Sequence, residues 1–309
     1  MSEDGTSALS WRTHQGLPVE EDRIFFQRAP GEIGNISSAD TTLRKGQLKF
    51  CVQRSAILLG LSLLPLLGGG AALLIDQVTG GPAWGPVGLF GGILLLLGVC
   101  GLQFHECTYV GDKGISRFGW NVPKFMISPL NSGVFVFENA RSLYVSSTRS
   151  YMNGIYSGTT ATFIWKDKAG KIVFNLNSSY YSYKEKPNRD RTIHFARSAE
   201  RAWSERVYSM HRAEREKLGQ TGFPLVNGGG IFVGSDSVTL RIGGKDTEIP
   251  RADLTGISVS GGYLSFHRPT DKGGIFGGGP LSVPYGSVGN AAALVRLLAT
   301  ELHVPVTGG

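Results

Sequence analysis

The sequence has only three cysteines, and their number and spacing exclude a disulfide framework and a Cys-x-x-Cys site. Cys51, Cys100 and Cys107 cannot supply a disulfide framework, and none has the Cys-x-x-Cys spacing of a metal or redox site. A reducing compartment suits them best. Cys51 and Cys107 lie just outside two apolar runs, so a lipidation or redox role is the alternative to plain packing.

Motifs that carry catalytic chemistry are also missing. Gly170-Lys171 lacks the upstream glycine and the following Ser or Thr of a phosphate loop, and the glycine-rich stretch 273–280 follows no strand-to-helix pattern. The six histidines are scattered, and in His-Glu-Cys at 105–107 neighbouring strand residues would point to opposite faces. We therefore expect no catalytic residue, no metal site, no cofactor and no enzymatic activity.

Charge is almost absent between residues 55 and 104, where Asp76 alone is charged. The run 55–75 has 21 residues without charge, which as a helix spans about 30 Å, the thickness of a bilayer core. The run 86–104 repeats this pattern after a turn rich in Gly and Pro. The region 55–104 therefore predicts a transmembrane hairpin, and two buried helices are the alternative.

Lys and Arg flank this hairpin on its outer ends, and the turn between the runs has neither. This distribution places both termini in the cytoplasm and predicts a multi-pass protein of the inner, cytoplasmic membrane. Small residues at a spacing of four favour packing of the two helices, or of two chains, at these positions: Gly68, Ala72, Gly88 and Gly92.

Three further regions follow from pattern. Residues 1–54 are polar and predict a flexible cytoplasmic N-terminal tail. Residues 105–219 and 220–309 alternate short β-branched and aromatic stretches with Gly, Asn and Asp, which is typical of antiparallel strands. Apolar periodicity predicts one amphipathic helix near the end of each region, at 193–218 and 290–302, with Asn290 placed to cap the second.

The two strand-rich regions are similar in detail and resemble a known kind of module. "YVGDKGIS" at 109–116 and "FVGSDSVT" at 232–239 share an aromatic residue, Val-Gly and a later β-branched residue, which suggests duplication at an offset of about 123 residues. With "IPRADLTGISV", "GGYLSF" and "SVPYGSVGNAAALVRLLATEL", the chain resembles bacterial membrane proteins of unknown function in which a transmembrane hairpin precedes pleckstrin-homology-like modules. The resemblance implies a membrane-anchored α+β fold: a two-helix transmembrane hairpin and two β-rich modules, each closed by a C-terminal amphipathic helix.

The basic excess lies in one part of the chain. The net charge is +7, and residues 105–220 carry 18 basic and 10 acidic side chains. Aromatic and cationic side chains together suit an anionic lipid surface. A solvated loop is the alternative reading. The candidates for lipid contact are Lys166, Lys168, Lys171, Tyr180, Tyr181, Tyr183, Lys184, Lys186, Arg189 and Arg191.

We expect a non-enzymatic, membrane-anchored adaptor or scaffold whose modules bind protein partners or self-assemble. Recognition of anionic lipid headgroups and a small oligomeric membrane effector or channel component are the alternatives. Nucleic acid is not expected as a partner, because acidic residues interleave with the basic ones along 193–218.

Overall fold

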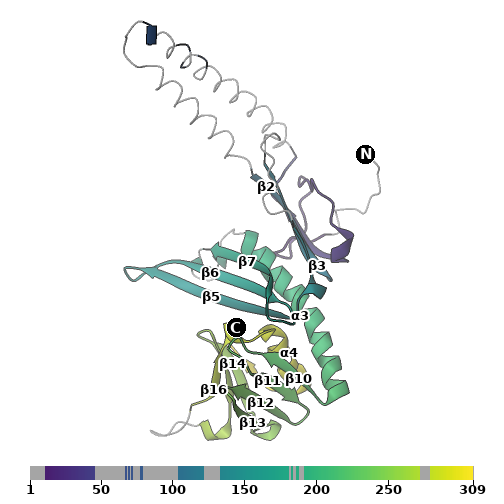
Figure 1. The fold of residues 1–309 in the computed structure, drawn as a ribbon, viewed down its shortest axis with the longest axis vertical. Coiled ribbons are helices and arrows are strands. Elements are labelled where there is room, and N and C mark those ends of the chain that lie inside the picture. The colour runs from purple at the N-terminus through teal and green to yellow at the C-terminus, as the bar shows by residue number, and fades with distance from the viewer. Residues whose placement is uncertain are drawn as a thin grey trace. The chain divides into compact units, whose positions relative to one another are not determined.

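The structure is a computed structural model that describes residues 11–45, 104–121, 133–180, 191–271 and 279–308, with a few single positions between them. Its contacts divide the chain into two compact units. The first contains Met1–Pro30, Ser38–Tyr109 and Ser116–Val134, and the second contains Gly31–Ser37, Val110–Ile115 and Phe135–Gly309. The described residues are mostly β-sheet, with the helices α3 (Arg191–Leu218) and α4 (Ala291–Glu301) (Figure 1).

The prediction of a membrane-anchored fold is overturned. In the described part of the chain, no helix is both long enough and apolar enough to cross a membrane. The expected two-span membrane partnership and the multi-pass location in the inner membrane are corrected on the same ground. Apart from single positions, the predicted spans 55–75 and 86–104 lie outside the described residues. So do the four predicted helix-packing positions, Gly68, Ala72, Gly88 and Gly92.

The prediction of two equivalent modules, each a sheet closed by a helix, is also wrong. The strands β2 (Phe104–Gly111) and β3 (Gly114–Asn121), expected to open the first module, belong to another sheet, of order β1-β2-β3-β4. Its outer strands are β1 (Ile36–Thr41) and β4 (Gly133–Val136). β1 lies within residues 1–54, which were predicted to be a flexible tail, so that prediction is wrong at this strand. The strand could not be predicted because its polar sequence ISSADT shows no clear apolar alternation.

The first unit gathers its aromatic side chains around Tyr109. The Trp11 ring lies edge-on to Phe25 at 5.3 Å and to Tyr109 at 5.8 Å between centroids. His14 is buried nearby, with Nδ1 2.8 Å from Ser38 Oγ and Nε2 2.9 Å from Thr108 Oγ1. The N-terminal region therefore supplies both apolar and polar groups to this core.

Most of the second unit follows Phe135, and its first sheet there is antiparallel with the order β5-β6-β7. Its strands are β5 (Ser142–Met152), β6 (Ile155–Lys166) and β7 (Ile172–Tyr180), and the short pair β8 (Ser182–Tyr183) and β9 (Lys186–Pro187) follows. The predicted hairpin across residues 165–174 is confirmed by the pairing of β6 with β7. The predicted helix at 193–218 is confirmed as α3, which contacts β6, β7 and β10.

Two four-stranded sheets and α4 complete the second unit. The first sheet runs β10 (Gln220–Pro224), β11 (Gly230–Gly234), β12 (Ser237–Ile242) and β13 (Lys245–Pro250) as an antiparallel meander. The second has the order β16-β15-β14-β17, with strands β14 (Gly256–Ser260), β15 (Tyr263–His267), β16 (Leu281–Pro284) and β17 (Val306–Thr307). The 3-10 turn η7 (Tyr285–Ser287) leads from β16 into α4, the second predicted helix.

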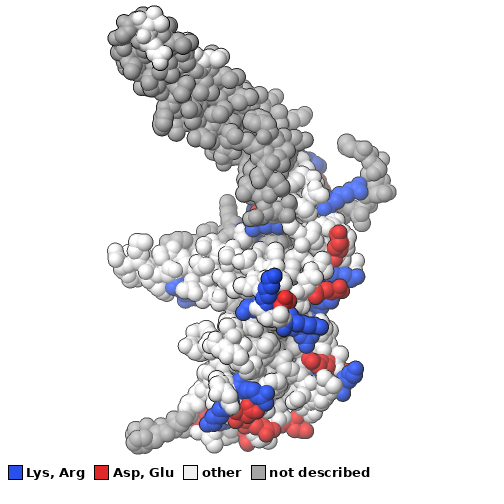
Figure 2. Space-filling model, viewed as in Figure 1, with Lys and Arg blue, Asp and Glu red and all other residues white. Residues whose placement is uncertain are grey.

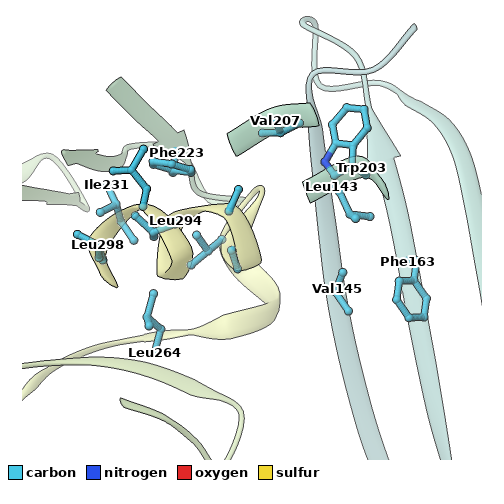
Figure 3. Packing of buried hydrophobic residues seen from close by; sticks show 14 of the residues in the cluster. Leu143, Val145, Phe163, Trp203, Val207, Phe223, Ile231, Leu264, Leu294 and Leu298 are labelled. Atoms are coloured by element: carbon cyan, nitrogen blue, oxygen red, sulfur yellow. The ribbon is translucent and has the colours of Figure 1, made fainter. Parts of the chain in front are cut away.

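One continuous hydrophobic core joins these elements of the second unit. The indole of Trp203 on α3 is buried beside Leu143 of β5, and Leu294 of α4 packs towards Phe223 and Ile231 of the β10–β11 pair (Figure 3). The core extends from the β5-β6-β7 sheet and α3 to the two four-stranded sheets and α4. Polar groups between these two halves of the unit are therefore shielded from water and need hydrogen-bond partners within the protein.

Candidate functional site

A buried histidine on α3 is the centre of the polar groups in the second unit. Trp203, Val207 and His211 are spaced four residues apart, so they lie on one face of the helix, and all three are buried. The helix ends at Leu218, and the next residue, Gly219, has a left-handed φ of +75° and donates its N–H to Arg215 O at 2.8 Å. Strand β10 starts at the next residue and contacts α3 along its last turns.

Strand β10 places two side chains on His211. Thr221 and Phe223 alternate with exposed or half-buried neighbours, so both point inward. The Phe223 ring stacks on the imidazole at 4.2 Å between centroids, and Thr221 Oγ1 lies 2.6 Å from His211 Nδ1. The same hydroxyl lies 2.6 Å from Glu214 Oε2. His211 is thus enclosed by an aromatic face and a hydroxyl.

These contacts determine which ring nitrogen of His211 carries a proton and whether the ring is charged. The Glu214 carboxylate can only accept, so the Thr221 hydroxyl donates to it and accepts the hydrogen bond from the Nδ1–H of His211. Burial lowers the pKa of His211 to about 4; Arg141 also lowers it, and Glu214 opposes both effects. At neutral pH the ring is therefore uncharged, with Nε2 as an acceptor.

Asn290 faces the other nitrogen of this ring. Its Oδ1 accepts the backbone N–H of Leu143 and the indole Nε1–H of Trp203, both at 2.9 Å. Its Nδ2 therefore faces Arg141 O, at 3.2 Å, and His211 Nε2, at 3.5 Å. The predicted helix cap is wrong, because Asn290 makes no side-chain hydrogen bond to α4. The side chain instead joins α3 to β5.

A cavity of 340 Å³ opens beside this network, within the second unit. It is lined by the start of β5, the turn between β6 and β7, α3, and the strands β10 and β11. Its polar lining includes Arg141, Asp167, Lys168, His211 and Asn290. The cavity thus combines two cationic side chains, one carboxylate and an uncharged histidine–amide pair.

The turn that carries Lys168 is well ordered by hydrogen bonds. Asp167 Oδ1 accepts the backbone N–H groups of Ala169 and Lys171, both at 2.9 Å. Gly170 has a φ of +80°, which a residue with a side chain rarely adopts. These interactions fix the backbone position of Lys168 at the cavity.

The structure divides the predicted lipid-contact residues between two places. Lys166, Lys168 and Lys171 lie at the β6–β7 turn, whereas Tyr180 ends β7 and Arg191 begins α3. At about 3.3 Å per residue, β7 separates Lys171 from Tyr180 by roughly 30 Å. Tyr183 and Lys186 are placed by backbone only, in β8 and β9, and the remaining three candidates lie outside the described residues: Tyr181, Lys184 and Arg189. The described members do not form one continuous patch.

A second surface feature is the far end of the β5–β6 hairpin, residues 146–158, which we call the distal ribbon. The first four residues of β5 are buried and the last seven are exposed, so both faces of the strand leave the core after Val145. The hairpin turns at Asn153 and Gly154, whose φ values of 51° and 78° suit a type I′ turn. In Figure 1 this end of the hairpin projects beyond β7.

The tip of the distal ribbon is apolar and exposed. Tyr151, Met152 and Ile155 have exposed fractions of 60%, 69% and 74%. Arg149 is the one charged residue in the ribbon, and its surface is almost free of charge in Figure 2. An apolar tip on a β-ribbon with a single charge is typical of a surface that contacts another protein.

Comparison with family models and with curated proteins assigns no relative. No family model and no curated protein matches the chain. The resemblance to bacterial membrane proteins with pleckstrin-homology-like modules is thereby corrected, in agreement with the sheet order described above. Within the described ranges, no group of three or more His, Cys, Asp or Glu side chains could hold a metal ion.

Of the residues that line the cavity, Lys168 was predicted only as a lipid contact and Asn290 only as a helix cap, and neither was predicted to belong to this site. Glu214 and Thr221 lie within ten positions of His211, whereas Arg141 and Asn290 are brought to this ring by folding. One signal was visible: His211 continues the apolar stripe of Trp203 and Val207, where a titratable side chain must be buried and needs partners.

Proposed function

We propose that this protein is a non-enzymatic scaffold that associates through its distal ribbon, and that its partner is a second copy of this chain. The observation that carries the proposal is the apolar tip of Tyr151, Met152 and Ile155 on an exposed hairpin. Burying these side chains against a partner removes apolar surface from water, which favours association.

The edge position of β5 supports strand pairing between copies. β5 is an outer strand of the β5-β6-β7 sheet, and η7 packs against it as far as Ser146, the first residue of the ribbon, where an added Cβ at Gly286 would lie 3.0 Å from Ser146 Cβ. The strand is exposed from Ser146 onward. An exposed edge strand can accept another strand, and antiparallel pairing of β5 with β5 extends the sheet across two copies.

The choice of a second copy rests on charge and size. A ribbon with Arg149 as its single charge presents little like-charge repulsion to itself. The ribbon supplies about 13 residues per copy, fewer than the roughly 20–30 of a standard interface. We therefore expect a weak dimer with a dissociation constant in the micromolar range.

Sedimentation velocity of the full-length chain over a concentration series tests this proposal. The triple variant Tyr151→Ser, Met152→Ser, Ile155→Thr should remain monomeric where the wild type dimerises. Ile242→Thr with Tyr263→Ser is the matched control, because these exposed apolar residues lie outside the ribbon. A wild type that stays monomeric at every concentration, or a triple variant that dimerises as the wild type does, contradicts the proposal.

Recognition of lipid headgroups and a channel component stay predictions of the sequence. The described basic candidates are divided between the β6–β7 turn and the start of α3, and the glycine-rich hairpin lies outside the described residues. The distal ribbon therefore gives the scaffold the stronger support.

A further inference from the structure

The cavity beside His211 lies at the opposite end of β5 from the distal ribbon, and self-association makes no use of it. We propose that this cavity binds a small organic anion that has a flat apolar body and one carboxylate or phosphate group. The body would lie against the aromatic wall of the cavity, and the anionic group would contact Arg141 and Lys168. This site is independent of the proposed scaffold function.

The size and walls of the cavity suit such a molecule. Pockets for small molecules range from about 300 to 1,000 Å³, so a volume of 340 Å³ fits a small ligand. The apolar lining is formed by Tyr144, Phe223, Pro224 and Phe232. Flat ligands stack on aromatic side chains, because offset and edge-to-face arrangements of rings are favourable.

Two glycine residues allow close contacts within the cavity wall that β10 and β11 form. A Cβ at Gly230 would lie 2.9 Å from the carbonyl oxygen of Phe223, and one at Gly222 would lie 3.1 Å from the Phe232 ring. Larger residues at these positions would displace either the strand or the ring. The wall is therefore built with close backbone contacts and without side chains at these two positions.

The charges at the cavity favour an anion. The two cations of the lining, Arg141 and Lys168, outnumber its one carboxylate, Asp167, whose Oδ1 accepts two backbone N–H groups of its own turn. The Arg141 guanidinium is 3.6 Å from Glu214, a long ion pair that leaves most of its five N–H donors for other acceptors. Lys168 is exposed and has no ion-pair partner among the described residues.

The position of these charges gives the ligand an orientation. Lys168 is exposed and the Arg141 side chain is 40% exposed, so both cations lie on the solvent side of the cavity. His211, Asn290 and Phe223 are buried and form its inner part. The inner polar pair is uncharged, because the imidazole is neutral and faces an amide. The anionic group therefore lies outward and the apolar body inward.

Lys171 provides a matched control for Lys168. Both lysines belong to the β6–β7 turn, and both side chains are exposed. Only Lys168 lines the cavity. General attraction of anions to this basic turn would depend on both residues, whereas binding in the cavity depends on Lys168.

Isothermal titration calorimetry of the full-length chain tests the proposal with defined probes. Benzoate supplies a flat carboxylate, phenyl phosphate a flat phosphate, benzamide a neutral analogue and inorganic phosphate an anion without an apolar body. We expect one site for benzoate or phenyl phosphate, and the tighter of the two identifies the anionic group. Lys168→Gln and Arg141→Gln should each weaken binding about tenfold, and Lys171→Gln by less than about twofold.

Several results would overturn the proposal. These are no binding of either aromatic anion, benzamide binding as tightly as benzoate, inorganic phosphate binding as tightly as phenyl phosphate, and equal losses for Lys168→Gln and Lys171→Gln. Near-ultraviolet circular dichroism checks that each variant is folded. If Arg141→Gln does not fold, the comparison of Lys168→Gln with Lys171→Gln decides alone, since both residues lie in an exposed turn.

Discussion

The Nε1–H of Trp203 donates to Oδ1 of Asn290 at 2.9 Å, across 87 positions of sequence. The same oxygen accepts the backbone N–H of Leu143, so a single amide group serves α3 and β5 together. Asn290 is only 4% exposed, and water cannot replace it there. The contact of α3 and β5 with the start of α4 therefore depends on this amide.

Replacing Asn290 should therefore destabilise the fold. Asn290→Ala leaves two buried donors unsatisfied at about 1–3 kcal/mol each, and it places alanine at a φ of 61°, which costs about 1–2 kcal/mol, for a total loss of about 3–8 kcal/mol. Urea unfolding measures this loss. Asn153→Ala is the control for the backbone effect, because Asn153 has a similar φ of 51° but is exposed. A loss no greater than that of the control would contradict the role of the amide.

The buried His211 should make stability depend on pH. Its pKa in the folded state is about 4, below the value of 6.5 for the free side chain. Above pH 6.5 neither state is protonated at His211 and there is no penalty; as pH falls from 6.5 towards 4, the unfolded state binds a proton that the folded state excludes. Folding stability should therefore fall by up to about 3 kcal/mol across this window.

Unfolding by urea at pH 7.5 and pH 4.5 measures the effect of His211 against His211→Gln. The difference in stability between wild type and variant should shrink as the pH falls, because glutamine does not titrate. Glu214 and Arg141 face the same ring and remain in both proteins. A constant difference between wild type and variant would show that His211 is not held neutral.

The sequence predicted local elements well, because periodicity is a local property. The spacing of Trp203, Val207 and their neighbours predicted 193–218 as a helix, and α3 spans Arg191–Leu218. The hairpin with its turn at Asp167 was predicted from turn residues, and its hydrogen bonds confirm it. Both features depend on residues within a few positions of one another.

Features that depend on distant partners could not be predicted. Asn290 was expected to cap α4, yet its side chain bonds to Leu143 at a separation of 147 residues. Lysines and tyrosines that are close in sequence were expected to act together, but an extended strand separates those the structure describes. Apolar runs of sufficient length predicted a membrane anchor, whereas no helix of the described ranges meets that requirement.

The contact between α3 and α4 includes one partly buried and one exposed set of ion pairs. Glu301 accepts from Arg215 at 2.9 Å and from the Tyr208 hydroxyl at 3.0 Å, and its side chain is 18% exposed. Glu205 pairs with Arg296, but its side chain is 65% exposed. Glu301→Gln should lower stability by about 1–2 kcal/mol and Glu205→Gln by less than about 0.5 kcal/mol. Thermal unfolding of both variants measures this contrast, and equal losses would contradict it.

Cys107 should resist thiol reagents in the folded protein. It is fully buried, and burial raises the pKa of its thiol, although hydrogen bonds such as that to Tyr109 act in the opposite direction. Because the thiolate is the reactive form, modification requires unfolding. In a Cys51→Ser, Cys100→Ser background, an aromatic disulfide reagent should titrate one thiol in denaturant and none under native conditions. Native labelling at the rate of a free thiol would show that this side chain is accessible, and would revive its proposed lipidation or redox role.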